Sequence, residues 1–410
     1  MMVLNAYQEL EAQGVIYSVQ KSGYFVAPFY PSSRPHANSE IRLNKQVEIN
    51  SLVFRYLKSI TDIEPLGSPF PSHDYLNPPK LLQILSQLSR DRTQIEPQPV
   101  LSGNVELRKL IAQRYRLQGI PTQADDIVIT SSCLDALNLS LQALTQQGDY
   151  ILLQQTVFYG AWQIAEKLGL NVVTLPDHPS GFVAFEQALQ RYPIKVCWFM
   201  LNCHNPLGFT VSPEIKQRIG ELLAQYQVHL IENDVYQELY YRGEKPLPMK
   251  AFDAQNWVLH CSSFSKILGA NFRIGWVHAG QFADKIQHLQ LMSTISANAL
   301  IQQALVEFIS NHHYEKHLRH LRRHLEKTKS SVWITYVSTC LQVVLSNTTA
   351  AAISFGYTCP NIWIVCGFIN SYSKKKSALA QVSFLPCLLR SIKGLGLIVL
   401  MLGTKRSNRR

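Results

Sequence analysis

One segment decides how the whole chain is interpreted: Ser262-Ser263-Phe264-Ser265-Lys266-Ile267-Leu268-Gly269-Ala270-Asn271-Phe272-Arg273-Ile274-Gly275-Trp276. Lys266 lies between hydroxyl side chains and a glycine, and an arginine follows seven residues later. The amine of such a lysine suits a Schiff base to the aldehyde of pyridoxal phosphate, and Ser263, Ser265 and Arg273 could hold the phosphate. Taken alone, the segment is as typical of a polar strand-to-loop crossing with a solvated lysine. Motifs elsewhere in the chain are needed to distinguish these two interpretations.

The composition is that of a protein with a large core. The chain has 410 residues, enough for two or three domains, and its apolar content is ordinary for a soluble protein. Its net charge of +11 arises in residues 327–410, which contain 11 basic and no acidic residues. The excess charge is therefore no sign of a basic DNA-binding face on the rest of the chain.

The start of the chain and the cysteines indicate a cytoplasmic protein. Residues 1–9 lack the basic start and the long apolar core of a signal peptide. The eight cysteines are scattered without metal-ligand spacing. We interpret them as reduced thiols in a cytosol.

Apolar strands alternate with helical patterns from about residue 48 to residue 326. We expect strands at residues 127–130, 150–153, 172–175, 196–200, 228–231 and 258–261. We expect helices over residues 134–144, through Ala165, and from Ser212-Pro213-Glu214, where proline suits the first turn. This alternation predicts an α/β fold with a mostly parallel central sheet and flanking helices. Ligands of such sheets lie at the carboxyl ends of the strands.

Three further clusters follow predicted strands. Thr130-Ser131-Ser132-Cys133 leads into a helix, whose free N–H groups attract phosphate; ordinary N-capping is the alternative. Asn205-Pro206-Leu207-Gly208 offers an amide to the cofactor's phenolate oxygen; a plain Asn-Pro turn is the alternative. Glu232-Asn233-Asp234-Val235-Tyr236 offers a carboxylate for the pyridine nitrogen and a tyrosine for the phenolate; a polar strand end with Tyr236 half buried is the alternative. Four such clusters in this order, each after a strand, favour a cofactor site over coincidence.

The beginning of the chain forms a short separate unit. Helical spacing of apolar residues ends at Gly14, and residues 15–19 and 23–27 alternate like two small strands. The piece is too small to bury a core alone. Residues 28–47 contain three prolines and are interpreted as a linker.

The end of the chain differs in character from the rest. Residues 330–373 carry no charged side chain, and the apolar runs lack a clear period. The window from Ala350 to Ile369 approaches membrane-spanning length, but Thr358, Pro360 and Asn361 near its centre argue against a membrane helix. We interpret residues 330–410 as an aberrant, poorly ordered segment of the kind that out-of-frame translation gives.

Two other groups of residues could suggest chemistry. A helix expected from Tyr314 to Lys327 brings His317, His320 and His324 onto nearby turns. No acidic or cysteine ligand joins them, so we favour a solvated basic helix over a metal site and predict no metal. Asp125-Asp126 precedes a strand and is interpreted as a turn rather than an acid–base pair.

Together the clusters resemble the class I/II aminotransferases of pyridoxal phosphate fold type I. The motifs are Asn-Pro-x-Gly, then an acidic pair with a tyrosine, then Ser-x-Ser-Lys with an arginine seven residues on. The resemblance extends over about residues 50–329. Residues 3–27 resemble the end of a GntR-type winged helix-turn-helix. A DNA-binding domain of this type joined to an aminotransferase-like domain resembles a MocR-type transcriptional regulator.

The resemblance implies a role for each matching residue. Lys266 would form the Schiff base and, with Tyr236, would be catalytic. Asn205 and Tyr236 would flank the ring oxygen, and Phe158 would stack on the ring. The positions near the pyridine nitrogen would be Asn233 and Asp234. Ser131, Ser132, Cys133, Ser263, Ser265 and Arg273 would surround the phosphate.

The resemblance also implies domain boundaries. Residues 1–27 would be a remnant of the winged helix, with its recognition helix end and wing, and residues 28–47 a linker. Residues 48–300 would form the cofactor-binding large domain and residues 301–329 the start of a small C-terminal domain. Residues 330–410 would be the aberrant tail.

The chain departs from the family pattern at the pyridine-pairing aspartate. The family places it three residues before the tyrosine, and Asn233 occupies that position here. Asp234 is one residue nearer, and neighbouring strand residues point to opposite faces, so Asp234 cannot simply substitute. An asparagine has no negative charge to keep the pyridine nitrogen protonated. We therefore expect reduced turnover with binding kept.

Two more departures concern the ends. The first helices of the winged helix should precede Met1, so we expect DNA binding to be lost or weak. The family's C-terminal lobe, with its arginine for the substrate carboxylate, finds no match in residues 330–410. Arg390 is the nearest candidate by position.

The leading hypothesis is a cytoplasmic MocR-type regulator whose aminotransferase-like domain binds pyridoxal phosphate. It would sense an amino acid or amine through an external aldimine, would act as a homodimer, and would have no membrane partner. The first alternative is a true aminotransferase that moves an amino group between an amino acid and a 2-oxo acid. The second is a non-functional truncated product.

Overall fold

The computed structural model describes residues 11, 16–19, 23–26, 42–44, 71, 73–91, 100–176, 182–205, 207–240, 243–339, 345–346, 354–359 and 362–367. The chain divides into two compact units, Met1–Asn38 and Ser39–Arg410.

The first unit contains an antiparallel hairpin of β1 (Ile16–Val19) and β2 (Gly23–Val26), as the alternating sequence predicts. Ile16 lies opposite Val26, and Val19 lies opposite Gly23. Gly23 has φ +101°, a value that side chains disfavour, so glycine suits the first position of β2. The helix expected before Gly14 lies outside the described residues except for Glu11.

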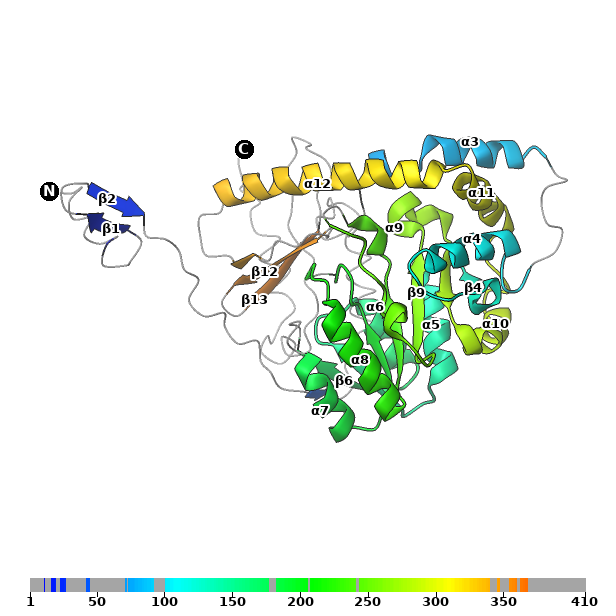
Figure 1. The fold of residues 1–410 in the computed structure, drawn as a ribbon, viewed down its shortest axis with the longest axis horizontal. Helices are drawn as coiled ribbons and strands as arrows, with labels where there is room; N and C mark the ends of the chain where they lie inside the picture. The colour runs from blue at the N-terminus through cyan, green and yellow to red at the C-terminus, as the bar shows by residue number, and fades with distance from the viewer. Residues whose placement is uncertain are drawn as a thin grey trace, which may run out of the picture. The chain divides into compact units, whose positions relative to one another are not determined.

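A mixed eight-stranded sheet forms the centre of the second unit (Figure 1). Its strand order is β3-β6-β5-β7-β8-β9-β10-β4. Strands β6, β5, β7, β8 and β9 pair in parallel, and β3 and β10 pair antiparallel to their neighbours. The strands are β3 (Arg42–Asn44), β4 (Ile127–Thr130), β5 (Tyr150–Gln154), β6 (Asn171–Leu175), β7 (Ile194–Phe199), β8 (His229–Asn233), β9 (Val258–Ser263) and β10 (Gly275–His278).

The predicted α/β fold with a mostly parallel sheet is confirmed, and six of these strands match expected positions. Two antiparallel strands, β3 and β10, were not expected. Strand β10 is only four residues long, and all four are buried, so it has no alternation that would reveal it. The first residues of β10 had been considered only as the end of the lysine segment and not as a strand.

Helices cover both faces of the sheet (Figure 1). Helix α8 begins as predicted, because Ser212 Oγ accepts a hydrogen bond from Ile215 N and proline follows in the first turn. The helices are α3 (Pro79–Leu88), α4 (Val105–Arg116), α5 (Cys133–Leu144), α6 (Tyr159–Lys167), α7 (Val183–Arg191), α8 (Pro213–Tyr226), α9 (Ser265–Leu268), α10 (Ala283–Leu291), α11 (Ala299–Ser310) and α12 (His313–Thr339). Short 3-10 turns are η1 (His73–Tyr75), η3 (Ala124–Asp126), η5 (Gln237–Leu239), η6 (Met249–Phe252), η7 (Ala270–Phe272) and η8 (Gly280–Phe282).

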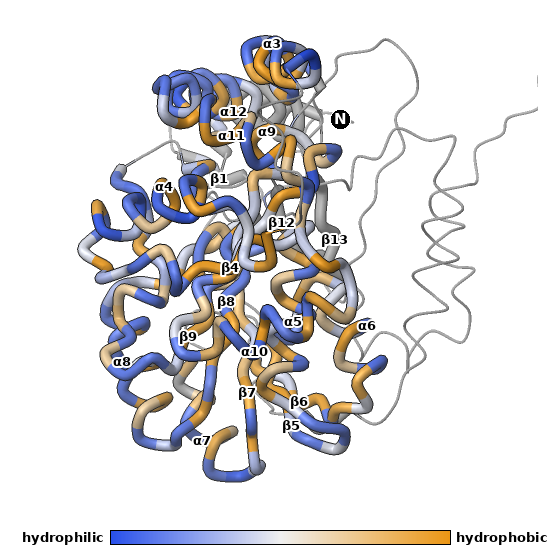
Figure 2. Tube along the Cα trace, turned by 90° about the vertical axis from the view of Figure 1, so that its right-hand side faces the viewer, coloured by the Kyte–Doolittle hydropathy of each residue, from blue (hydrophilic) through white to orange (hydrophobic). Residues whose placement is uncertain are grey.

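Each face of the sheet supports its own apolar core. Along β7, Val196 and Trp198 pack into one core, and Cys197 and Phe199 pack into the other. Alternate residues of a strand point to opposite faces, so a strand covered on both sides is apolar throughout. Figure 2 shows hydrophobic residues along the strands and many hydrophilic residues along α7 and α8. This packing fixes the strand ends that carry the polar clusters.

Helix α12 is more deeply packed than the expected solvated helix. Tyr314, Leu318, Leu321 and Leu325 are buried along one stripe of it. His317 Nε2 lies 2.8 Å from the carbonyl oxygen of Ile267, and the rings of His324 and Tyr75 stack with centroids 3.4 Å apart. The interpretation as a solvated helix is therefore wrong for this face, where all three histidines have partners, since the ring centroid of His320 lies 6.1 Å from that of Tyr75.

The predicted turn at Asp125-Asp126 is confirmed as η3. Asp125 Oδ1 lies 2.9 Å from Arg108 Nη1, and Asp126 Oδ2 accepts a hydrogen bond from Gln123 N at 2.7 Å. Both carboxylates therefore hold the turn before β4.

Past Lys329, α12 continues to Thr339, and a three-stranded antiparallel sheet follows. The membrane-helix alternative is wrong for the described part of its window, because β12 and β13 pair there as strands. No helix in the described ranges has both the length and the apolar character needed to cross a bilayer. The remaining residues of this region, Arg390 included, lie outside the described residues. The strands are β11 (Leu345–Ser346), β12 (Ser354–Cys359) and β13 (Ile362–Gly367).

Candidate functional site

Lys266 lies in the short helix α9, immediately after the carboxyl end of β9. Its side chain is partly buried, and burial lowers the pKa of the amine to about 7, although Cys133 acts in the opposite direction. A large share of these amines is therefore neutral near pH 7. The neutral amine is the nucleophile that attacks an aldehyde.

Tyr236 contacts this lysine, and two further predicted residues, Asn233 and Cys133, contact each other. Lys266 Nζ lies 5.5 Å from the centroid of the Tyr236 ring. Asn233 Oδ1 lies 3.7 Å from the Sγ of Cys133, the first residue of α5. Tyr236 is buried rather than half buried, and burial raises the pKa of its phenol, which therefore keeps its proton. The ends of β8 and β9 and the start of α5 thus bring these side chains to one place.

The start of α5 and the two serines before it, Ser131 and Ser132, are called the cup below, because the first N–H groups of a helix have no carbonyl partner within it. Ser132 Oγ accepts a hydrogen bond from Asp135 N at 3.1 Å, so this serine does cap the helix. Ser131 N donates to Asp135 Oδ2 at 3.0 Å. Burial raises the pKa of Asp135, while the hydrogen bond from Ser131 and the charge of Arg273 oppose the increase. Arg273 therefore lies close enough to act on the cup electrostatically.

Strand β10 lies between β9, which leads into the lysine segment, and β4, which leads into this cup. Gly275 pairs with Ser263 of β9 on one side and with Thr130 of β4 on the other. A Cβ on Gly275 would lie 2.4 Å from the carbonyl carbon of Ser132 and 2.5 Å from Cys133 N. Only glycine allows this approach without movement of the backbone. The buried Oγ of Ser265 makes no hydrogen bond with the described residues.

Asn205 and Phe158 have less contact with the lysine. Asn205 is 9% exposed, and its backbone N lies 3.0 Å from Met200 Sδ; Pro206 is outside the described residues. Phe158 precedes α6, and its ring centroid lies 4.5 Å from that of Tyr159. Neither of these two contacts involves Lys266.

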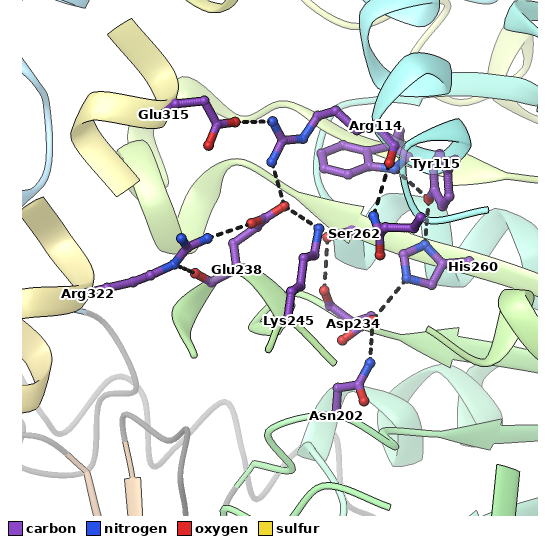
Figure 3. Close-up of polar contacts among 12 residues, drawn as sticks. Arg114, Tyr115, Asn202, Asp234, Glu238, Lys245, His260, Ser262, Glu315 and Arg322 are labelled. Atoms are coloured by element: carbon purple, nitrogen blue, oxygen red, sulfur yellow. Dashed lines mark hydrogen bonds and ion pairs between the residues drawn. The ribbon is translucent and has the colours of Figure 1, made fainter. Parts of the chain in front are cut away.

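Asp234 lies beside Asn202 and His260 (Figure 3), whereas Asn233 lies beside Cys133. Its Oδ2 accepts a hydrogen bond from Asn202 Nδ2 at 2.9 Å and lies 3.1 Å from His260 Nε2. His260 Nδ1 lies 2.6 Å from the hydroxyl of Tyr115, to which Trp276 Nε1 donates at 3.0 Å. This buried chain of polar groups holds Asp234 away from the Asn233–Cys133 contact.

The sequence interpretation missed this network. Lys216 completes it, because its Nζ donates to Asn202 Oδ1 at 2.6 Å, and Glu232 Oε2 lies 3.9 Å from His260 Nε2. Burial raises the pKa of Glu232 well above its usual range, and nearby Asp234 adds to the increase. A histidine inside the apolar run Val258–Cys261 was the signal that could have revealed the network.

A second polar cluster surrounds Glu238, two residues after Tyr236 (Figure 3). Its carboxylate lies 2.7 Å from Arg114 Nη2, 2.7 Å from Lys245 Nζ and 3.0 Å from Arg322 Nη2. Burial alone would raise the pKa of this carboxyl, but the neighbouring cations outweigh it and lower the pKa to about 2. Glu238 is therefore ionised at all physiological pH values.

Comparison with known proteins identifies the family of this fold and site. Residues 70–349, more than half of the chain, match the family described as aminotransferase class I and II. The HTH-type transcriptional regulator YdcR of Escherichia coli, itself uncharacterized, is 47% identical over 341 residues, which cover 81% of this chain and 72% of YdcR. The chain belongs to the HTH-type regulators with an aminotransferase class I and II domain. The regulator YjiR of the same organism is 31% identical over 354 residues, which cover 82% of this chain and 74% of YjiR. The predicted regulator family is confirmed.

Solved structures agree on the fold of the regulator. The kynurenine aminotransferase of Pyrococcus horikoshii superimposes with a TM-score of 0.69 at 22% identity, covering 78% of this chain and 80% of the enzyme. The α-aminoadipate aminotransferase LysN of Thermus thermophilus gives a TM-score of 0.67 at 18% identity, covering 72% of this chain and 76% of LysN. Fold type I of the pyridoxal phosphate enzymes is thereby confirmed.

Pyridoxal phosphate is the cofactor that this family implies, and the donor set of the regulator fits it. An amine of lowered pKa suits the aldehyde, and the cup of N–H groups at α5 suits the phosphate. The unpartnered Oγ of Ser265 offers one more donor beside them. Residues that could hold the cofactor therefore surround the predicted lysine.

Proposed function

We propose that the second unit of the regulator binds pyridoxal phosphate through Lys266 and senses an amino acid or amine there. The observation that carries the proposal is the amine of Lys266, whose pKa is about 7, beside Tyr236, Asn233 and Cys133 at the ends of two parallel strands. Bound in this place, the cofactor would supply an aldehyde for amines and an electron-withdrawing ring. Ligand binding would then change how the regulator contacts DNA.

Each residue has a proposed task. Lys266 holds the aldehyde carbon, and the Tyr236 phenol, which keeps its proton, donates to the ring oxygen together with the Asn205 amide. Ser131, Ser132, Cys133, Ser263, Ser265 and Arg273 hold the phosphate, and Phe158 covers the ring. The amide of Asn233 faces the pyridine nitrogen. Because this amide is neutral, binding is retained while turnover is weak.

We also propose that the regulator works as a cytoplasmic homodimer and that its first unit contacts DNA. The β1–β2 hairpin supports this, because a two-stranded wing is part of a winged helix. The names of the related regulators support it too, since they describe HTH-type proteins.

Transaminase activity is the second candidate. The lowered pKa of Lys266 favours it, because a lysine that is neutral near pH 7 can also move a proton. In that case the regulator would transfer an amino group between an amino acid and a 2-oxo acid, and Asn233 would limit the rate.

A visible absorption spectrum of the purified protein with pyridoxal phosphate tests the proposal. We expect a band that borohydride removes, and mass spectrometry should then find the reduced cofactor on Lys266. Lys266→Ala should lose both signals, whereas Lys195→Ala, an exposed lysine of β7, should keep them. Addition of a panel of amino acids and amines should shift the band for at least one of them. A reduced cofactor attached elsewhere, or no band at all, would remove the basis of both candidate functions.

A further inference from the structure

A cavity lies between α12 and two residues that come after η5, Tyr240 and Gly243. Its volume is about 360 Å³, which is within the range of small-molecule sites. None of its lining residues belongs to the proposed cofactor site. The lining residues are Tyr240, Gly243, Arg319, Arg322, Arg323 and Glu326.

Three guanidinium groups meet on one face of α12. Arg319, Arg322 and Arg323 are spaced three and four residues apart, so their side chains are neighbours on the helix surface. Like charges at this spacing repel one another and destabilise a helix. Among the described lining residues, Glu326 alone carries a carboxylate. The cavity therefore has an excess of positive charge.

Arg322 is held in place by its partners. Its Nε donates to the carbonyl oxygen of Glu238 at 2.7 Å, and its Nη2 donates to Glu238 Oε2 at 3.0 Å. Its guanidinium carbon also lies 4.1 Å from the centroid of the Tyr240 ring. Within the described residues Nη1 makes no hydrogen bond, and a side chain already held in place loses less conformational entropy when a ligand binds.

The other two arginines retain most of their donors. Arg323 Nε donates to the carbonyl oxygen of Arg319 at 3.3 Å, and its terminal nitrogens have no hydrogen-bond partner among the described residues. The guanidinium of Arg319 forms no hydrogen bond or ion pair with the described part of the chain. Glu238 cannot neutralise them, because Arg114, Lys245 and Arg322 already share its carboxylate.

We propose that this cavity binds a small polyanion carrying at least two phosphate or carboxylate groups. Guanidinium groups bind such oxygens in pairs, and three of them converge here with free N–H donors. A polyanion would also relieve the repulsion along α12. Its binding would act on Glu238, which lies two residues from Tyr236, so the polyanion site is connected with the cofactor site.

Isothermal titration calorimetry with inorganic pyrophosphate tests this site on the full chain. The protein is first saturated with pyridoxal phosphate, so that the cup at α5 is filled. We expect one pyrophosphate per chain, bound at least about tenfold more weakly by Arg319→Gln/Arg323→Gln. The control Lys167→Gln/Lys285→Gln removes the same charge from exposed positions on α6 and α10 and should leave the affinity unchanged.

Three outcomes would overturn the assignment. The first is that pyrophosphate does not bind. The second is an equal loss of affinity in the two double variants, because the effect would then be one of general charge. The third is that a short DNA duplex binds, loses affinity with Arg319→Gln/Arg323→Gln, and is not displaced by pyrophosphate. The arginines would then contact a nucleic acid instead of a small polyanion.

Discussion

At the scale of single residues, the proposed chemistry of the regulator depends on two neighbours, Asn233 and Asp234. Alternation along β8 explains their different surroundings: Asn233 meets Cys133, whereas Asp234 meets Asn202 and His260. The spacing rule of the family placed Asn233 at the pyridine-pairing position, and that role stays a prediction. The rule could not reveal the partners of Asp234, because these come from strands that are distant in sequence.

Replacement of Asn233 by aspartate should increase transaminase activity. A carboxylate at this position would keep the pyridine nitrogen protonated and make the ring a better electron acceptor. We expect the half-reaction with an amino acid to become about tenfold faster or more, while the affinity for pyridoxal phosphate stays within about a factor of three. Stopped-flow absorption after mixing with an amino acid measures the rate. An unchanged rate in Asn233→Asp would mean that residue 233 does not face the pyridine nitrogen.

The protonation of the Lys266 amine should control how the rate of pyridoxal phosphate addition depends on pH. Its folded-state pKa of about 7 lies below the ordinary value of 10.5, so the protein holds the neutral form from pH 7 upward. The rate at which pyridoxal phosphate adds to the apoprotein should therefore rise between pH 6 and pH 7 and level off above. The contribution of Lys266 to stability should increase with pH between about 7 and 10.5, because the unfolded chain binds the extra proton in that range. A rate that continues to rise up to pH 10 would show an ordinary lysine.

At the scale of elements, the candidate site depends on the close approach of β10 to the start of helix α5. The sequence predicted α5, β8 and β9 because their apolar patterns and caps are local signals. It did not predict β10, whose four buried residues resemble a loop of the lysine segment. The arginine-lined cavity on α12 was also missed, because only the histidines of this helix were considered as possible ligands.

Gly275→Ala tests the contact between β10 and α5. The added methyl group would meet the backbone of Ser132 and Cys133, which cannot move like a flexible side chain. We expect a loss of about 1–3 kcal/mol in the free energy of unfolding and at least about tenfold weaker binding of pyridoxal phosphate. Urea unfolding and a fluorescence titration of the cofactor measure the two effects.

Gly148→Ala is a suitable comparison for this variant. Its added Cβ meets nothing within 4 Å, but its φ of +91° strains any side chain. It should lower stability by about 1 kcal/mol and leave cofactor affinity unchanged. If both alanine variants bind pyridoxal phosphate equally well, the approach of β10 to the cup has no role in binding.

At the scale of the whole molecule, local sequence patterns predicted helices and strands, but not which strands pair. The alternation of strands and helices was sufficient to predict the α/β class and the edge of the sheet where the polar clusters meet. The order of the strands was not predictable in this way, since β10 lies between β9 and β4 although β4 comes much earlier in the chain. In the sequence, only the Pro-rich residues 28–47 indicated a boundary between two units. The division between Asn38 and Ser39 falls within them.

The position of β4 has a consequence for synthesis on the ribosome. In the described sheet, β4 pairs only with β10, so residues 127–130 have no strand partner until residues 275–278 have been made. The nascent chain therefore carries an unpaired apolar edge while all of β5 to β9 emerges, and such edges promote aggregation. Ribosome pausing before residue 275 should expose this edge to chaperones, whereas pausing after residue 278 should not.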